Sequence, residues 1–224
     1  MRLKGLGVAL LLLCSIAAIA QDIVKINHTY YTSYFSTKQH IPLLVQYTLT
    51  GEMVSCGPDT KIPRSVGKFK ADPEAPEITN LAKDYLRSGY DKGHNMSAAD
   101  NSCNEEGMKE CFYFSNMTPQ PHFFNAGVWE KLERQERDEA IEYGQVVVSI
   151  GSVGKAGTIG PDEVVVPKYM WKVIYIPSKK VYECYIFPNS DEAKQPLEEY
   201  LTPKDVLEAH ADVTFKKGIA TLNE

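Results

Sequence analysis

The sequence predicts a single α+β domain with a largely antiparallel central sheet flanked by helices. Runs rich in tyrosine and β-branched residues, which favour strands, occur in both halves of the chain. Two of these runs are separated only by residues 177–180, whose composition is typical of a hairpin turn. A segment with helical spacing follows Asn125, between the two groups of strands. The chain contains no internal repeat, low-complexity tract or linker that would divide it.

The first twenty residues have the pattern of an export signal. Two basic residues precede an apolar run at residues 6–17, and Ala18-Ile19-Ala20 forms a cleavage site with a small residue at each end. The apolar run is too short for a membrane span. Cys14 offers lipid attachment as an alternative, which is less favoured because a leucine precedes it. We therefore expect residues 1–20 to be removed and residues 21–224 to form one secreted or periplasmic domain.

The formal net charge of −5 argues against nucleic-acid binding through bulk electrostatics. Loss of the export signal would remove two positive charges and no negative ones, so the mature chain would be more acidic still. Any polyanion would therefore have to be held by a local cluster of lysine and arginine, with the acidic residues facing elsewhere.

Four cysteines lie beyond the export signal, and an even number in an exported chain is compatible with two disulfides. Three pairings are open. We expect Cys103 to pair with Cys111, which would close a short loop, and this leaves Cys56 to pair with Cys184. The alternative is that these cysteines are free buried thiols, especially Cys184, which lies in an apparently internal strand.

Two strands are expected near the start of the domain, at residues 30–35 and 43–49. Residues 51–76 are rich in glycine, proline and charge and predict a long surface loop. Residues 78–87 have helical spacing and are followed by a serine and a glycine, which are typical of a helix end. The basic side chains of the loop could contact phosphates or could be ordinary solvated charges; they are Arg64, Lys68 and Lys70.

Four further strands are expected in the second half of the chain, at residues 145–151, 164–166, 171–176 and 181–187. The first of these is a β-branched run typical of a central strand. Thr202 is expected to cap a short helix that runs through His210. The tail after Phe215 is expected to be peripheral.

Residues 90–133 predict a compact ββα unit that gathers three kinds of polar side chain. An extended segment carries His94, a second strand is expected at residues 112–117 with Asn116 near its end, and a helix is expected to open at Asn125. Glu133 follows on this helix. The unit would place an imidazole, a neutral amide oxygen and a carboxylate around one small space.

The helix spacing also indicates what kind of metal ion such a space would suit. Asn125 and Glu133 would lie about 12 Å apart along the axis, although the lean of helical side chains shortens this gap. We infer that only one of them contacts an ion directly and that the other acts through water. A site with one amide ligand and many waters suits a hard cation such as Mg²⁺.

Each of these residues also has a structural interpretation when it is taken alone. Asn125 is a favoured helix N-cap, Glu133 could be a solvated residue of a charged helix, and Asn116 could satisfy a turn. His94 could be a hydrogen-bonded structural histidine, and Arg137 could form a surface salt bridge. Their occurrence together at one set of spacings favours a functional site.

Three motifs carry a resemblance to a known family. They are SGYDKGH at residues 88–94, FSNMTPQ at residues 114–120 and NAGVWEKLE at residues 125–133, with a weaker match at residues 166–176. The sequence resembles the DNA/RNA non-specific endonuclease family, the ββα-metal nucleases related to endonuclease G. The resemblance extends from about residue 31 to about residue 215.

The resemblance implies a role for each residue of the ββα unit. His94 corresponds to the general base that activates water, and Asn125 to the direct Mg²⁺ ligand. Glu133 corresponds to the residue that holds water on the metal and so takes part in catalysis. Asn116 corresponds to a residue that supports the substrate or the base. Manganese is expected to be able to replace magnesium.

The resemblance also implies phosphate-binding residues. Arg137 matches a family arginine that contacts phosphate, and Arg64 is a candidate for a second one. The family motif is usually D-R-G-H, whereas this chain has Lys92 in place of the arginine. Lysine keeps the charge but loses the bidentate fork that fits phosphate, so activity or substrate preference is expected to differ.

These observations lead to two hypotheses about function. The first is an exported, Mg²⁺-dependent endonuclease that hydrolyses DNA and RNA with little sequence specificity. The second is a catalytically weak relative that binds nucleic acid or a protein partner, which Lys92 and the acidic composition favour. The sequence is compatible with a homodimer and identifies no inhibitor protein.

Overall fold

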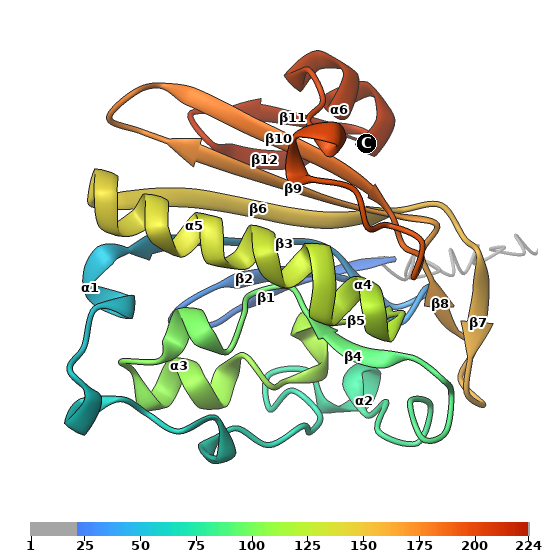
Figure 1. Cartoon of the computed structure of the whole chain (residues 1–224). Coiled ribbons are helices and arrows are strands. Elements are labelled where there is room, and N and C mark those ends of the chain that lie inside the picture. The colour runs from blue at the N-terminus through green and yellow to red at the C-terminus, as the bar shows by residue number, and fades with distance from the viewer. Residues whose placement is uncertain (1–21, 224) are drawn as a thin grey trace, which may run out of the picture.

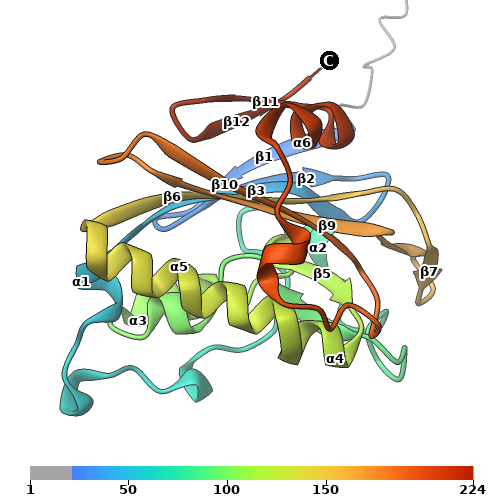
Figure 2. The ribbon, with the colours of Figure 1, turned by 45° about the horizontal axis from the view of Figure 1, so that its top comes forward.

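The computed structural model describes residues 22–223, so the expected export signal at residues 1–20 and Cys14 lie outside the described residues. The chain forms three layers, of which the central sheet is the middle one (Figure 1). One long helix and the ββα unit lie on one face, and a C-terminal helix and hairpin lie on the other (Figure 2). Within the described part of the chain, no helix combines the length and apolar character that a bilayer span requires.

The central sheet has the strand order β1-β2-β3-β6-β9-β10, and every neighbouring pair is antiparallel, which confirms the predicted fold class. The predicted central strand is β6, which pairs with β3 on one side and β9 on the other. The strands of this sheet are β1 (Ile23–Asn27), β2 (Thr32–Ser36), β3 (Ile41–Thr50), β6 (Gln145–Val153), β9 (Tyr169–Ile176) and β10 (Val181–Pro188).

Three small two-stranded ribbons, six α-helices and several short 3₁₀ or π-helical turns complete the described chain. The ribbons pair β4 (Asp91–His94) with β5 (Met117–Gln120), β7 (Gly157–Ile159) with β8 (Val164–Val166), and β11 (Val213–Lys216) with β12 (Ile219–Leu222). The helices are α1 (Gly51–Val54), α2 (Pro76–Thr79), α3 (Glu105–Glu110), α4 (His122–Phe124), α5 (Glu130–Tyr143) and α6 (Lys204–Ala211).

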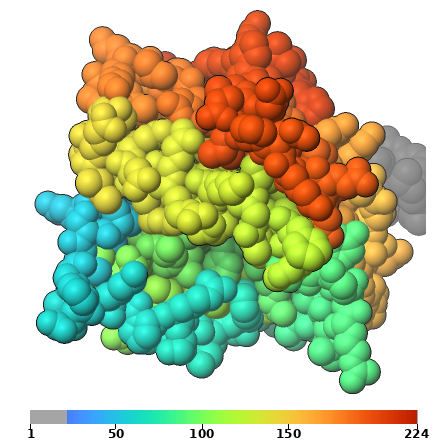
Figure 3. All heavy atoms as spheres, in the orientation of Figure 1, coloured from blue at the N-terminus to red at the C-terminus, as the bar shows by residue number. Residues whose placement is uncertain are grey.

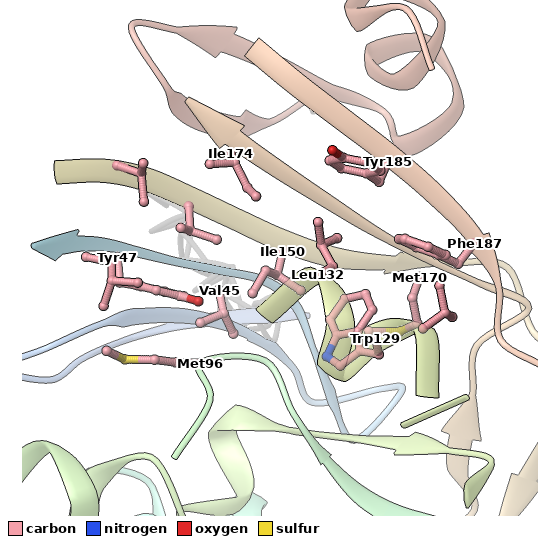
Figure 4. Packing of buried hydrophobic residues seen from close by; sticks show 14 of the residues in the cluster. Val45, Tyr47, Met96, Trp129, Leu132, Ile150, Met170, Ile174, Tyr185 and Phe187 are labelled. Carbon is pink, nitrogen blue, oxygen red and sulfur yellow. The ribbon is translucent and has the colours of Figure 1, made fainter. Parts of the chain in front are cut away.

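Helix α5 is fixed to the sheet by its apolar side. Trp129 and Leu132 are fully buried in a core that includes Ile150, Met170 and Phe187 (Figure 4). Burial of each such side chain contributes roughly 1.5–3 kcal/mol to folding. The polar residues between these apolar anchors are therefore held at defined positions on the exposed side of the helix.

The C-terminal tail is not peripheral, contrary to expectation. Strands β11 and β12 and helix α6 cover the second face of the sheet, where Phe215 and Ala220 are buried against Trp171 and Leu207. The Gln46 amide fastens the hairpin by donating to the Ala220 carbonyl at 2.9 Å and accepting from its N–H at 2.7 Å. Each strand of this hairpin has only four residues, so its alternating burial is too short a pattern to distinguish a strand from the sequence alone.

The helix expected at residues 78–87 is also wrong. Helix α2 ends at Thr79, and a series of turns follows it. Leu81 and Tyr85 are buried, so the apolar spacing marked core residues correctly without indicating a helix. The Thr79 hydroxyl donates to the Ala75 carbonyl and accepts from the Asp72 N–H, which ties the end of α2 to the preceding loop.

Two other local predictions are displaced. The second strand of the ββα unit is Met117–Gln120 rather than residues 112–117, because a 3₁₀ turn occupies Phe114–Asn116. Helix α6 begins after Pro203, and the Thr202 hydroxyl donates to the Tyr200 carbonyl instead of capping the helix.

The predicted disulfide pairing is wrong. Cys56 is bonded to Cys103, whereas Cys111 and Cys184 are free and buried. Helix α3 separates Cys103 from Cys111 and turns Cys111 into an apolar cluster with Met108 and Phe112. The alternative of a free buried thiol is therefore confirmed for Cys184 and applies to Cys111 as well.

Candidate active site

The β4–β5 ribbon presents His94 at its end. His94 is paired with Met117 across the ribbon. A Cβ on the preceding Gly93 would lie 2.1 Å from the side-chain oxygen of Gln120, so a larger residue here would displace the buried Gln120 side chain. The Trp129 indole N–H donates to the His94 carbonyl at 3.3 Å, which joins the ribbon to the long helix.

The imidazole of His94 lies in a largely aromatic environment. Its ring centroid is 5.6 Å from that of Phe69 and 4.8 Å from that of Phe112. Burial lowers the pKa of His94 to about 3, and the positive charge of Arg64 adds to this effect, while a backbone hydrogen bond to Lys92 opposes it. The ring is therefore neutral near pH 7. Its Nε2 has no hydrogen-bond partner among the described residues.

The helix that carries the other predicted ligands starts earlier than expected. It begins at His122, after Pro121, and Asn125 lies in its second turn rather than at its start. Residues Asn125–Trp129 form a π-helical turn, with Gly127 at the non-helical angles φ −114° and ψ −107°. Such turns change the direction of side chains within a helix and are common at functional sites. The N-cap interpretation of Asn125 is thus wrong.

Asp91 holds the Asn125 side chain in place. The Asn125 amide nitrogen donates to the Asp91 carboxylate at 2.9 Å, and the same oxygen lies 2.9 Å from the His122 ring nitrogen. Because the amide nitrogen is engaged by Asp91, the carbonyl oxygen of Asn125 is left as the group available to a ligand.

A pocket of about 370 Å³ brings most of the predicted site residues together. Helix residues form one wall, the segment after β4 forms the floor, and an exposed loop forms the opposite wall. Figure 3 shows a hollow between the yellow helix α5 and the cyan loop. The polar residues that line the pocket are Lys61, Arg64, His94, Ser97, Ser102, Asn125, Glu130, Glu133 and Arg137.

Glu133 and Arg137 lie one turn apart on the helix wall, and both interact with the segment after β4. Burial raises the pKa of Glu133 to about 7 and nearby Asp100 adds to the shift, whereas Lys172 and Arg137 oppose it. Arg137 donates to the buried Asp100 carboxylate at 3.0 Å. Burial alone would lower the pKa of Arg137, but this ion pair raises it.

A buried polar network supports this wall from below. Lys172 and Glu136 form a fully buried ion pair at 2.7 Å. The Tyr47 hydroxyl lies 2.9 Å from Glu136 and 3.2 Å from Asp100. Strands β3 and β9 are thereby linked to the ion pair that holds Arg137.

Two predicted site residues do not line the pocket. Asn116 is fully buried, and its amide donates to the carbonyls of Met96 and Cys111 and accepts from the Met96 N–H. Lys92 places its ammonium over the rings of Phe69 and Tyr85, at 5.1 and 5.6 Å from the centroids. Asn116 therefore shapes the backbone that follows His94, and Lys92 contacts Phe69, one of the two aromatic residues that border the imidazole.

Sequence reasoning gave no role to several residues that build the site. Asp91 was visible as the first residue of its motif, but its contact with Asn125 spans 34 positions. Asp100 and Ser97 follow His94 closely, and Lys61 lies in a loop of mixed composition. Nothing in the local pattern distinguished Ser97, Asp100 and Lys61 from ordinary surface groups.

The donor set fits a hydrated divalent cation better than a cation fully enclosed by protein. The Asn125 carbonyl oxygen and the Glu133 carboxylate are hard oxygen donors in one pocket. Within residues 22–223, no group of three or more histidine, cysteine or acidic side chains is arranged to hold a metal ion. A cation here would retain most of its water, as Mg²⁺ does in many protein sites.

Comparison with known proteins identifies the family. A profile described as "DNA/RNA non-specific endonuclease" matches residues 16–222. The chain belongs to this family. It is 31% identical to Nuclease C1 of Cunninghamella echinulata var. echinulata over 182 residues, which cover 73% of this chain and 72% of that one.

Two further matches relate the chain to mitochondrial nucleases and to a solved structure. It is 39% identical to mitochondrial nuclease EXOG of Danio rerio over 120 residues, 48% of this chain and 35% of the relative. A crystal structure of an EndoG/EndoGI complex, concerned with EndoG inhibition, matches with a TM-score of 0.78 and 29% identity, covering 87% of this chain and 86% of that chain. The matched region spans between a third and two thirds of several curated relatives. The fold is thus the ββα-metal nuclease fold.

Proposed function

We propose that this protein is a divalent-cation-dependent endonuclease that hydrolyses phosphodiester bonds of DNA and RNA with little sequence specificity. The observation that carries the proposal is that one pocket gathers His94, Asn125 and Glu133 between Arg64 and Arg137. These residues come from three separate parts of the chain, so their convergence is not a consequence of sequence proximity. Family membership supports the same reaction.

His94 is the general base in this proposal. Its Nε2 has no partner among the described residues, and the low pKa keeps the ring unprotonated, as a base must be. A pKa of about 3 would make it a weak base in the free protein. An anionic phosphate bound beside the ring would raise that pKa and strengthen the base. The proton of the attacking water would pass to Nε2.

Asn125 and Glu133 are the residues proposed to hold Mg²⁺, with Mn²⁺ as a substitute. When bound, the cation would offset the negative charge that develops on the phosphoryl and leaving oxygens. Asp91 orients the Asn125 amide for this role. Glu133 would act through water and would become ionised, because a nearby cation lowers the pKa of a carboxyl.

Phosphate would be held from both walls of the pocket. Arg137 is kept in place by Asp100, and Arg64 lies on the opposite loop. Both guanidinium groups can donate in pairs to phosphate oxygens. The polar groups assigned here act on phosphate, sugar or water rather than base edges, so cleavage is expected to tolerate many sequences.

We also propose that the protein is exported and functions as an oxidised protein outside the cytoplasm. The N-terminal pattern supports export, and the Cys56–Cys103 disulfide is typical of oxidising compartments. Mass spectrometry of the protein recovered from its native compartment should find Gln21 as the first residue and two fewer hydrogens than the reduced chain. Recovery of an intact residue 1 in reduced cytoplasmic protein would contradict export.

The test of the proposed function is plasmid degradation with and without a chelator. Wild-type protein with Mg²⁺ should nick and then degrade plasmid DNA, and EDTA should abolish this activity. His94→Ala should lower the rate by about 10²- to 10⁴-fold, the range for loss of a general base. His210→Ala is the matched control, because His210 is an exposed residue of helix α6 on the far face of the sheet.

A second candidate function is binding without efficient cleavage. The position of Lys92 outside the pocket wall favours it, since the family arginine is replaced here by a lysine that lies on aromatic rings. Wild-type protein that binds DNA but leaves it intact in Mg²⁺ and Mn²⁺ would support this alternative. Degradation that persists in EDTA, or in the His94→Ala variant, would contradict the proposed mechanism.

A further inference from the structure

The loop wall of the pocket is formed by a short exposed segment, residues 57–66, which we call the basic strap. It contributes Lys61, Ile62 and Arg64 to the pocket lining. Apart from two short 3₁₀ turns, Pro58–Thr60 and Arg64–Val66, it has no regular secondary structure. Its position therefore depends on contacts with the rest of the molecule.

Few contacts hold the basic strap. The Cys56–Cys103 disulfide fixes its start to the segment that follows the pocket floor, across 47 positions of sequence. The Ile62 N–H donates to the Ser102 carbonyl at 2.7 Å. Ile62 and Val66 pack, half-buried, against a small apolar cluster that contains Met108 and Phe112, and the Arg64 guanidinium lies over the Phe112 ring, 4.9 Å from its centroid. The covalent bond is thus the strongest of a small number of tethers.

The basic strap also carries positive charge that is not neutralised locally. Lys61 and Arg64 are exposed, and neither forms an ion pair within residues 22–223. On the opposite wall, by contrast, Arg137 is paired with Asp100, and Glu130 and Glu133 also face the pocket. A phosphate that enters the pocket would therefore find unneutralised cationic groups mainly on the strap side.

We propose that Lys61 binds a substrate phosphate beside Arg64, and that the Cys56–Cys103 disulfide positions both residues, so that opening the disulfide weakens nucleic-acid binding. This inference rests on the proposed function and deepens it. No motif indicated Lys61, which is recognised only through its place in the pocket.

The chemistry of opening is an ordinary exchange with a dithiol reductant. One thiolate of the reductant attacks a disulfide sulfur, and its second thiol displaces the remaining protein cysteine. The protein gains two electrons and two protons as Cys56 and Cys103 become thiols, while the reductant becomes a cyclic disulfide. Both cysteines are half-buried rather than enclosed, so a small dithiol can reach them. The freed strap would lose the chain constraint that holds Lys61 near the pocket.

The first experiment tests Lys61 by its charge. Lys61→Met is compared with Lys216→Met, an exposed lysine of β11 on the far face of the sheet. DNA binding is measured in the His94→Ala background without Mg²⁺, so that cleavage does not interfere. We expect Lys61→Met to weaken binding about three- to tenfold and to reduce the slope of log affinity against log salt by about one, as loss of one phosphate contact requires. Lys216→Met should change neither quantity.

The second experiment tests the disulfide in active protein. Dithiothreitol should raise KM about threefold or more while kcat changes by less than about twofold, since His94 and Asn125 lie on other elements. Cys56→Ser should show the raised KM from the start and should no longer respond to dithiothreitol. Cys184→Ser, which removes a free buried thiol, should respond like the wild type.

The outcomes separate this inference from the proposed function. An unchanged KM on confirmed reduction of the disulfide, or an unchanged salt slope in Lys61→Met, would overturn the role of the strap while leaving the nuclease assignment intact. Loss of all cleavage in the wild type would instead contradict the assigned reaction, and the binding measurement in the His94→Ala background would still report on Lys61. If Cys56→Ser fails to fold, reduction of folded wild-type protein and Lys61→Met decide the question.

Discussion

The two walls of the pocket are built in different ways. The helix wall places Glu133 and Arg137 on helix α5 and Asn125 on the π-helical turn that precedes it, and the apolar side of this wall is buried in the main core. The basic strap on the other side has no long helix or strand and is held by one disulfide, one backbone hydrogen bond, a small apolar cluster and the contact of Arg64 with the Phe112 ring. The two residues proposed to hold the metal ion lie on the rigid wall, and the more exposed of the groups proposed to bind phosphate lie on the tethered one.

The largest expected effect is a loss of stability when the buried ion pair beneath the helix wall is broken. Glu136→Ala would leave the Lys172 ammonium buried without a partner, because the two groups form a fully buried ion pair. We expect a loss of about 3–5 kcal/mol in the free energy of unfolding. Urea denaturation measures this, with Glu142→Ala as a control on the exposed side of the same helix.

A double variant sharpens the same test. Glu136→Leu combined with Lys172→Met removes both charges together, and most of the lost stability should return, since no isolated charge remains buried. If Glu136→Ala costs less than about 1 kcal/mol, the helix wall does not depend on this pair, and the contrast between the walls is weaker than we infer.

The second effect concerns the orientation of Asn125. Asp91→Ala removes the carboxylate that accepts from the Asn125 amide nitrogen. Loss of a group that orients a metal ligand typically costs about 10- to 100-fold in metal affinity or activity. The measurement is the Mg²⁺ concentration that gives half-maximal plasmid cleavage, which should rise. An unchanged Mg²⁺ requirement would show that Asn125 is held without Asp91.

How much of this site the sequence could predict differs between the two walls. The spacing of Asn125, Glu133 and Arg137 placed them on one helix, because helical periodicity is a local property. The π turn at Asn125–Trp129 was missed, because the non-helical angles of Gly127 leave no mark on the periodic pattern of apolar residues. The same local reasoning placed five of the six strands of the central sheet but missed β1 and gave a false helix at residues 78–87.

The loop wall could not be predicted for a complementary reason. The partner of Cys56 is 47 positions away and is chosen by the packing of helix α3, which turns Cys111 inward and leaves Cys103 accessible. Lys61 and Arg64 become site residues only through that long-range tether. Sequence patterns carry little information about such contacts. The basic residues of the loop were therefore recognised as a group, but their place in the wall of the pocket could not be predicted.

The third effect is a pH dependence of stability in metal-free protein. The pKa of Glu133 rises from an ordinary value of 4.5 to about 7 in the folded chain, chiefly through burial. The folded state therefore holds a proton that the unfolded state has already released. This contribution to stability is complete below pH 4.5 and is lost as the pH rises through 7.

Glu133→Gln should remove that dependence. The wild type should lose stability relative to the variant between pH 4.5 and pH 8, measured by urea denaturation in EDTA. His94 acts in the opposite direction, because its lowered pKa costs stability as the pH falls below about 6.5, so only the difference between the two proteins isolates Glu133. Parallel pH profiles for the two proteins would show that the Glu133 carboxyl is not desolvated.

The smallest expected effect distinguishes two basic residues next to the site. Both residues lie over aromatic rings, Lys92 over Phe69 and Tyr85 and Arg64 over Phe112, but only Arg64 forms part of the pocket lining. The Lys92 ammonium is engaged by aromatic rings and lies outside the pocket lining, so Lys92→Met should change KM by no more than about twofold with kcat preserved. Arg64→Met should raise KM about fivefold in the same assay. If Lys92→Met raises KM more than Arg64→Met does, the Lys92 ammonium must leave the aromatic rings and reach the phosphate when substrate binds. The lysine would then serve as the family arginine does, despite its different position in the free protein.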